Sequence, residues 1–126
     1  MLALDTSAIV DFLGAASTQA AKQVELALSQ RMAVLPPVVL TELLSDSNLK
    51  GELRRIILEI PMLEIGEGYW ARAGELRAKV LKQGRKARLA DTLIAQVCID
   101  HSAVLVTCDK DFKAFSSAAG FKVVGI

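Results

Sequence analysis

Cysteine, histidine and aromatic residues are scarce in this 126-residue sequence, and each scarcity excludes a class of structure. Its two cysteines, Cys98 and Cys108, lie outside any Cys-x-x-Cys pattern. They indicate free thiols in a reducing compartment and exclude a disulfide framework. The single histidine, His101, has no histidine or cysteine partner at ligand spacing, which excludes a zinc site. With aromatics at only 5%, Leu, Val, Ile and Ala must fill the core.

The sequence also lacks long apolar runs, a basic leader and a strong net charge. No run approaches the roughly 18 apolar residues that span a bilayer, so no membrane association is expected. The first residues, "MLALDTSAIV", contain no base and reach Asp5 early, unlike a signal peptide. A net charge of +1 indicates no partner by itself. We therefore expect a cytoplasmic protein with a single domain over residues 1–126.

Short apolar runs alternate with longer segments of helical periodicity. This alternation predicts an α/β domain with a largely parallel sheet and helices on both faces. The predicted strands are Leu2–Leu4, Met32–Leu35, Met62–Ile65, Ala103–Val106 and Lys122–Val124. The predicted helices are Thr18–Gln30, Pro37–Ser45, Leu49–Leu58, Glu67–Leu81 and Leu89–Ile99, with a short one at Phe112–Phe115. In Glu67–Leu81, the spacing predicts a buried face of Trp70, Ala73, Leu76 and Val80.

Acidic residues follow the predicted strands. Asp5 ends the first strand, Asp109 and Asp111 follow the fourth, and Asp91 begins the Leu89 helix. Glu42 lies inside the apolar stretch "PPVVLTELL", where a charged side chain must be paired, protonated or bound to a metal. Ligands of open parallel sheets bind at the carboxyl ends of the strands. Acids converging there would repel one another, and a hard divalent cation such as Mg²⁺ or Mn²⁺ would offset that repulsion.

Each aspartate also fits a structural role. Asp5, Asp91, and either Asp109 or Asp111 can cap or complement the start of a helix, since aspartate is a leading capping residue. Glu42 resists the capping explanation because it lies within a helix, but it can instead lie on a boundary face and reach solvent. The acids taken together therefore indicate a cation site more specifically than any one of them does alone.

Four motifs in sequence resemble the PIN-domain family, most closely its VapC-type toxins. They are "LDTSAIVDFL", "PPVVLTELL", "RLADTLIAQVC" and "VLVTCDKDF", and together they cover nearly the whole chain. The resemblance implies a Rossmann-like, three-layer domain with a central sheet of about five strands. It also implies an endoribonuclease that depends on Mg²⁺ or Mn²⁺ and hydrolyses RNA phosphodiester bonds.

The resemblance assigns roles to individual residues. It implies that Asp5, Glu42, Asp91 and Asp109 are the catalytic and metal-binding acids. Supporting roles fall to the hydroxyls of Ser7 and Thr107 and to the second acid, Asp111. The resemblance further implies a homodimer and a small antitoxin protein that blocks the site. The helices Thr18–Gln30 and Leu49–Leu58 are candidate interface surfaces.

The basic residues are concentrated in one segment. Residues 72–88 contain seven bases and one acid, a net of +6 that leaves −5 for the rest of the chain. In the glycine-containing loop before Asp91, we expect Arg85, Lys86 and Arg88 to bind RNA phosphates. The bases of the preceding helix are expected to form an ordinary solvated face.

Other functions remain open at this point. A receiver domain needs an acidic doublet after its first strand, and an aspartate-nucleophile phosphatase needs D-x-D-x-T there; the stretch "LDTSAI" offers neither. A PIN-fold binding module without nuclease activity is a second alternative, which intact acids at all four positions disfavour. A solitary PIN nuclease acting on another nucleic acid, such as structured DNA, is a third.

Overall fold

A four-stranded parallel sheet forms the centre of the fold in a computed structural model that describes residues 1–126. The strands are β1 Leu2–Leu4, β2 Ala33–Val34, β3 Val104–Val106 and β4 Val123–Val124, in the order β2-β1-β3-β4. Leu4 is aligned with Val106 across the β1–β3 pair. Residues of these two strands that face the core have no exposed surface, which is typical of parallel strands covered on both faces.

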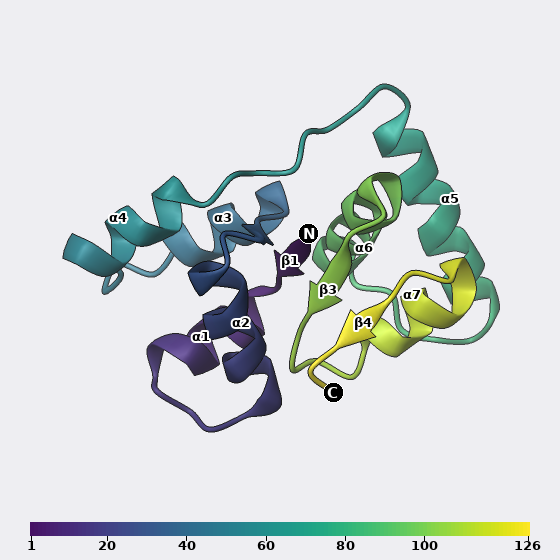
Figure 1. The fold of residues 1–126 in the computed structure, drawn as a ribbon. Helices are drawn as coiled ribbons and strands as arrows, with labels where there is room; N and C mark the ends of the chain where they lie inside the picture. Colours follow the sequence, from purple (N-terminus) through teal and green to yellow (C-terminus); the bar gives the residue numbers. More distant parts are fainter.

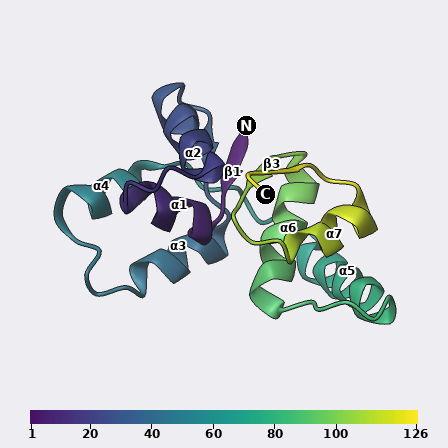
Figure 2. The ribbon, with the colours of Figure 1, turned by 90° about the horizontal axis from the view of Figure 1, so that it is seen from below.

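Seven helices connect and cover the strands: α1 Thr6–Leu13, α2 Gln19–Ser29, α3 Pro37–Leu44, α4 Gly51–Glu59, α5 Tyr69–Lys82, α6 Leu89–His101 and α7 Phe112–Ala119. Figures 1 and 2 show α1–α4 gathered on one side of the β1–β3 pair and α5–α7 on the other. The predicted three-layer α/β fold is therefore confirmed. No helix is both long enough and apolar enough to cross a membrane.

Local sequence signals explain several helix boundaries. Thr18 caps α2 by accepting a hydrogen bond from the Ala21 amide at 3.1 Å. Pro37 occupies the first turn of α3, where its missing N–H costs nothing. Gly120 ends α7 at φ +74°, in the left-handed region that glycine adopts without strain. The predicted short helix at Phe112–Phe115 therefore continues to Ala119.

The predicted strand Met62–Ile65 does not form. Only an isolated parallel bridge joins Met62 to Leu35. The Leu35 amide donates to the Pro61 carbonyl, and the Leu63 amide donates to the Leu35 carbonyl. The chain then leaves the sheet edge and crosses to α5 in Figure 1. The sheet consequently has four strands where about five were predicted.

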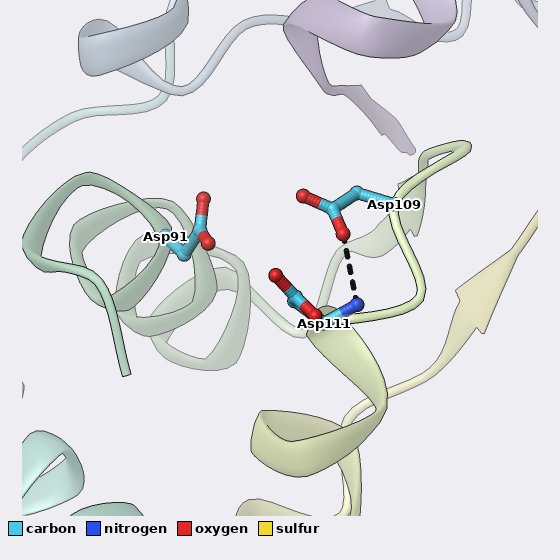
Figure 3. A group of neighbouring side chains, drawn as sticks. All are labelled: Asp91, Asp109 and Asp111. Atoms are coloured by element: carbon cyan, nitrogen blue, oxygen red, sulfur yellow. Dashed lines mark hydrogen bonds between the residues drawn. The ribbon is translucent and has the colours of Figure 1, made fainter. Parts of the chain in front are cut away.

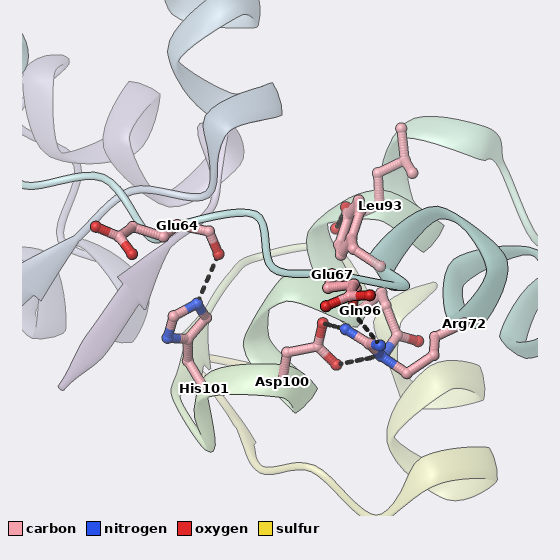
Figure 4. A network of polar contacts seen from close by, with 8 residues as sticks. Glu64, Glu67, Arg72, Leu93, Gln96, Asp100 and His101 are labelled. Carbon is pink, nitrogen blue, oxygen red and sulfur yellow. Dashed lines mark hydrogen bonds and ion pairs between the residues drawn. The ribbon is translucent and has the colours of Figure 1, made fainter.

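Polar contacts attach this crossing segment to the end of α6 (Figure 4). Arg72 binds the Asp100 carboxylate through Nε at 3.1 Å and Nη2 at 2.7 Å, and its Nη1 donates to the Glu67 carbonyl at 2.8 Å. His101 Nε2 lies 2.8 Å from the Glu64 carbonyl oxygen. Arg72 and His101 are thus occupied in fixing the fold.

The prediction that Trp70 lies in the core is wrong. Trp70 is 67% exposed, whereas its neighbour Tyr69 is only 2% exposed. The buried face of α5 is Tyr69, Ala73, Leu76 and Val80. Tyr69 also donates a hydrogen bond to the Leu93 carbonyl at 2.5 Å. The helical period was read correctly, but its first member was misplaced by one residue.

Candidate active site

Three aspartates from two elements converge at the carboxyl edge of the sheet (Figure 3). Asp91 comes from the first turn of α6, and Asp109 and Asp111 come from the turn between β3 and α7. One carboxylate oxygen from each lies within 4.8 Å of the other two. All three side chains are half-buried, so they are shielded from water on one side and open on the other.

The turn that carries Asp109 is held by its own polar groups. The Asp109 amide donates to Thr107 Oγ1 at 3.0 Å, and the Asp109 carboxylate accepts from the Asp111 amide at 2.9 Å. Asp111 occupies the N-cap position of α7, but its side chain makes no capping hydrogen bond. Its carboxylate lies in the acidic cluster with those of Asp91 and Asp109.

Asp5 lies beside this cluster and is held by two hydroxyl groups. Its Oδ2 accepts from Thr107 Oγ1 at 2.6 Å and from Ser7 Oγ at 2.7 Å. Each hydroxyl has one hydrogen, so the 3.2 Å contact between the two oxygens is not itself a hydrogen bond. Asp5 is only 5% exposed, yet no fully buried side-chain oxygen lacks a partner. Oδ1, which accepts no hydrogen bond, must therefore face solvent.

Asp5 occupies the N-cap position of α1 without making a side-chain capping bond. Asp91 does not cap α6, because Arg88 occupies that position. Capping thus accounts for where Asp5 sits in the chain but not for what its carboxylate contacts. The other structural role considered, complementing the helix dipole, fits Asp91, which lies in the first turn of α6. It does not account for the proximity of the Asp91 carboxylate to those of Asp109 and Asp111.

Repulsion between the acids is visible at Asp91. Burial, followed by the negative charges of Asp109 and Asp5, raises the pKa of Asp91 to about 6; Arg88 opposes the shift and Asp111 adds to it. Four carboxylates therefore share one electrostatic environment. A set of hard oxygen donors carrying excess negative charge fits Mg²⁺ or Mn²⁺ and does not fit a soft metal.

Glu42 reaches solvent, as the boundary-face alternative expected. It is exposed, and its Oε1 accepts a hydrogen bond from Thr6 Oγ1 at 2.9 Å. The expectation that it lies on a buried apolar face is wrong, because the buried residues of α3 are Val39 and Leu43. Glu42 also lies outside the group of Asp91, Asp109 and Asp111.

Comparisons with known proteins agree with this arrangement. A family model described as "PIN domain" matches residues 2–117. The chain belongs to the PIN domain family. It is 35% identical over 121 residues to VapC ribonuclease Mb1587 of Mycobacterium bovis and to Ribonuclease VapC11 of Mycobacterium tuberculosis, with 89% of each chain covered. The resemblance to VapC proteins noted in the sequence is confirmed.

Solved structures share the fold of this PIN domain at lower identity. VapBC2 from Rickettsia felis, bound to a promoter DNA fragment, matches with a TM-score of 0.72 at 19% identity and covers 98% of this chain and 96% of that one. VapBC-5 from Mycobacterium tuberculosis, a member of the VapBC toxin–antitoxin family, matches with a TM-score of 0.68 at 23% identity, covering 98% and 97%. At these identities the likeness concerns the fold.

Basic side chains border the acids of the PIN domain on one side. Arg85, Lys86 and Arg88 are exposed in the loop before α6. Lys86 Nζ lies 3.5 Å from Asp111 Oδ2, so this loop reaches the acidic cluster. On α5, by contrast, Arg77 donates to the Ala87 carbonyl and Lys79 to the Ala118 carbonyl, at 2.8 and 2.6 Å. These two bases support the fold by binding backbone carbonyls, whereas the sequence predicted only a solvated helix face.

Sequence reasoning missed one acid near the site, Asp11. Its Oδ2 accepts from Cys108 Sγ at 3.2 Å and from Thr18 Oγ1 at 3.0 Å. Burial and the hydrogen bond to Asp11 raise the pKa of the Cys108 thiol, so it stays protonated at neutral pH. The available signal was spacing, because Asp11 lies one helical turn after Ser7 and shares its face of α1.

Proposed function

We propose that this PIN domain is a divalent-metal-dependent endoribonuclease and the toxin of a VapBC-type toxin–antitoxin pair. The observation that carries the proposal is the convergence of Asp91, Asp109 and Asp111, with Asp5 beside them. Kinship with proteins named VapC ribonucleases, at 35% identity over 89% of the chain, supports RNA as the substrate.

The residues fit a hard divalent cation. Asp91, Asp109 and Asp111 would hold it, together with the solvent-facing Oδ1 of Asp5. We propose Mg²⁺ or Mn²⁺ because every donor is a carboxylate oxygen. When bound, such an ion lowers the pKa of a coordinated water and polarises phosphoryl oxygens.

The chain itself orients the groups around the ion. Ser7 and Thr107 hold Asp5 by donating to one of its oxygens, which leaves the other for the ligand. Glu42 accepts a hydrogen bond from Thr6 at the protein surface and lies outside the group of three aspartates. We propose that it orients the attacking water by accepting a hydrogen bond from it, and that the aspartates ligate the metal.

RNA would approach along the loop before α6. Arg85, Lys86 and Arg88 are exposed in the loop that borders the acids, so they can bind backbone phosphates next to the scissile bond. Lys86 pairs with Asp111 at 3.5 Å, and both side chains are partly exposed. Such an exposed pair is weak, so a phosphate competes readily for Lys86.

The partners proposed are an antitoxin protein and a second copy of this chain. An open hollow of about 510 Å³ between α2 and α4 is lined by Leu28, Ile56, Ile60 and Pro61 among others. Leu53, Ile56 and Leu58 of α4 are substantially exposed, so this face supports an apolar interface. A short neighbouring reading frame whose product binds the chain and inhibits cleavage would support the toxin assignment.

The test of the activity is cleavage of a panel of RNAs and matched DNAs with Mg²⁺, Mn²⁺ or excess chelator. We expect cleavage of RNA that stops in chelator and returns with added Mn²⁺. The variant Asp5→Asn should lose at least about 100-fold in rate, more than loss of an outer-shell partner costs. Cleavage that persists in chelator, or undiminished cleavage by Asp5→Asn, would disprove the metal-nuclease assignment.

A further inference from the structure

Cys108 is held twice by one face of α1. Its backbone amide donates to Ser7 Oγ at 3.0 Å, and its thiol donates to Asp11 Oδ2 at 3.2 Å. Ser7 and Asp11 are four residues apart, so both project from the same side of the helix. The residue that immediately precedes Asp109 is therefore fixed through both its backbone and its side chain.

The same oxygen of Asp11 also reaches a third element. It accepts from Thr18 Oγ1 at 3.0 Å, and that threonine caps α2 through the Ala21 amide. Both lone pairs of Asp11 Oδ2 are thus used by protein donors. One carboxylate oxygen ties the β3–α7 turn, helix α1 and the start of α2 together.

We propose that Asp11 is a positioning residue for the metal site, which holds Asp109 in place through the thiol of Cys108. The inference rests on the proposed function, because Asp109 is there a metal ligand. The Asp109 carboxylate already accepts from the Asp111 amide, so its direction follows that of the turn. The turn is anchored at Thr107 and Cys108, and Asp11 supplies the outermost anchor.

The hydrogen bond between the Cys108 thiol and the Asp11 carboxylate can be tested by selective substitution. A thiol is a weak donor, but a charged acceptor strengthens its hydrogen bond. An alanine at position 11 removes the acceptor and the charge, whereas an asparagine removes the charge and keeps an oxygen that can accept both bonds. Comparing Asp11→Ala with Asp11→Asn therefore separates positioning from electrostatics.

The first measurement is Mn²⁺ affinity by calorimetry for the full chain. We expect Asp11→Ala to weaken binding about tenfold relative to Asp11→Asn, the lower end of what an outer-shell partner contributes. Two variants of Cys108 make the same comparison from the donor side, since alanine removes the donor and serine keeps one. Cys108→Ala should match Asp11→Ala, and Cys108→Ser, whose hydroxyl still donates, should stay within about twofold of the unmodified protein.

Thr18→Val is the control for a merely structural effect. It removes the cap of α2 and one bond to Asp11, which lowers stability, but leaves Cys108 attached. Its Mn²⁺ affinity should be unchanged. Equal affinities for Asp11→Ala and Asp11→Asn, or an equal loss in Thr18→Val, would overturn the proposal.

A second measurement needs no metal. The amides of Cys108 and Asp109 donate to Ser7 and Thr107, so their hydrogen exchange reports whether the turn is held. We expect both amides to exchange at least about tenfold faster in Asp11→Ala than in Asp11→Asn, which keeps an acceptor oxygen. Unchanged exchange in Asp11→Ala overturns the positioning role. If the unmodified protein binds no Mn²⁺ yet exchange responds as expected, only the proposed function fails.

Discussion

Asp91 is the residue whose chemistry depends most on its neighbours. Burial and the charges of Asp109 and Asp5 raise its pKa to about 6, while Arg88 acts in the opposite direction. A carboxyl in this position is partly protonated near neutral pH. If the proposed cation binds there, we expect its binding to release a proton from Asp91.

We expect the carboxyl of Asp91 to titrate with a midpoint near pH 6 in metal-free protein, followed by the ¹³C shift of its side chain. Asp109→Asn should lower that midpoint, because it removes the neighbouring charge that raises the pKa of Asp91 most. Glu25→Gln, an exposed charge change on α2, should leave it in place. A midpoint near 4 in the unmodified protein would contradict the electrostatic description of the site.

The same pKa predicts how stability depends on pH. The folded pKa lies above the unfolded value of 3.8, so ionisation of Asp91 costs stability as pH rises from about 4 to about 6. Above pH 6 the full cost is present and stays constant. The melting temperature of Asp91→Asn, minus that of the metal-free unmodified protein, should therefore increase as the pH rises through this window. Above pH 6 the difference should stay constant. A difference that does not vary with pH would contradict the shift.

At the scale of elements, α5 shows what periodicity can and cannot determine. The sequence pattern correctly predicts a helix there and the burial of Ala73, Leu76 and Val80. It does not distinguish Tyr69 from Trp70, because both are large and either can begin the apolar stripe. The choice depends on a tertiary contact, the hydrogen bond from Tyr69 to Leu93.

Alanine substitutions at these two aromatic positions should differ sharply. Tyr69→Ala empties a buried site and should lower the free energy of unfolding by about 3 kcal/mol or more. Trp70→Ala changes an exposed side chain and should stay within about 0.5 kcal/mol. Urea denaturation of both variants measures the difference. A larger loss for Trp70→Ala would show that the stripe was assigned to the wrong residue.

The last strand, β4, pairs with β3 and so supports the turn that carries Asp109. The Thr107 amide donates to the Val124 carbonyl at 3.0 Å, and Gly125 follows with φ +100°. A Cβ at position 125 would lie 2.5 Å from the Thr107 carbonyl oxygen and 3.0 Å from the Ala20 Cβ. Glycine is required there by both backbone conformation and space.

Gly125→Ala should therefore destabilise the fold by about 2 kcal/mol or more, because strain and a clash with backbone act together. The matched control is Gly74→Ala in α5, where an added Cβ meets nothing within 4 Å. That variant should gain about 0.5 kcal/mol from the better helix propensity of alanine. Urea denaturation of Gly125→Ala with an unchanged midpoint would contradict this view of the C-terminal strand.

At the scale of the whole molecule, the sequence predicts the fold and most of the acidic centre. The strand Leu2–Leu4 and the presence of helices α2–α7, though not their exact ends, follow from apolar spacing and turn residues, which are local properties. Helix α1 was not among the predicted helices. The burial of Glu42 and the strand at Met62–Ile65 were wrong because each depends on how distant segments pack. Neither the place of Asp111 in the acidic cluster nor the contact of Asp11 with Cys108 could be predicted without the geometry of the β3–α7 turn.

The most direct test of the central claim is the rate of RNA cleavage as a function of Mn²⁺ concentration under single-turnover conditions. We expect the unmodified protein and Glu25→Gln to saturate at the same Mn²⁺ concentration, because Glu25 is exposed on α2 away from the cluster. Asp109→Asn should need at least about tenfold more Mn²⁺ and cleave more slowly at saturation. Identical Mn²⁺ curves for Asp109→Asn and Glu25→Gln would contradict the account.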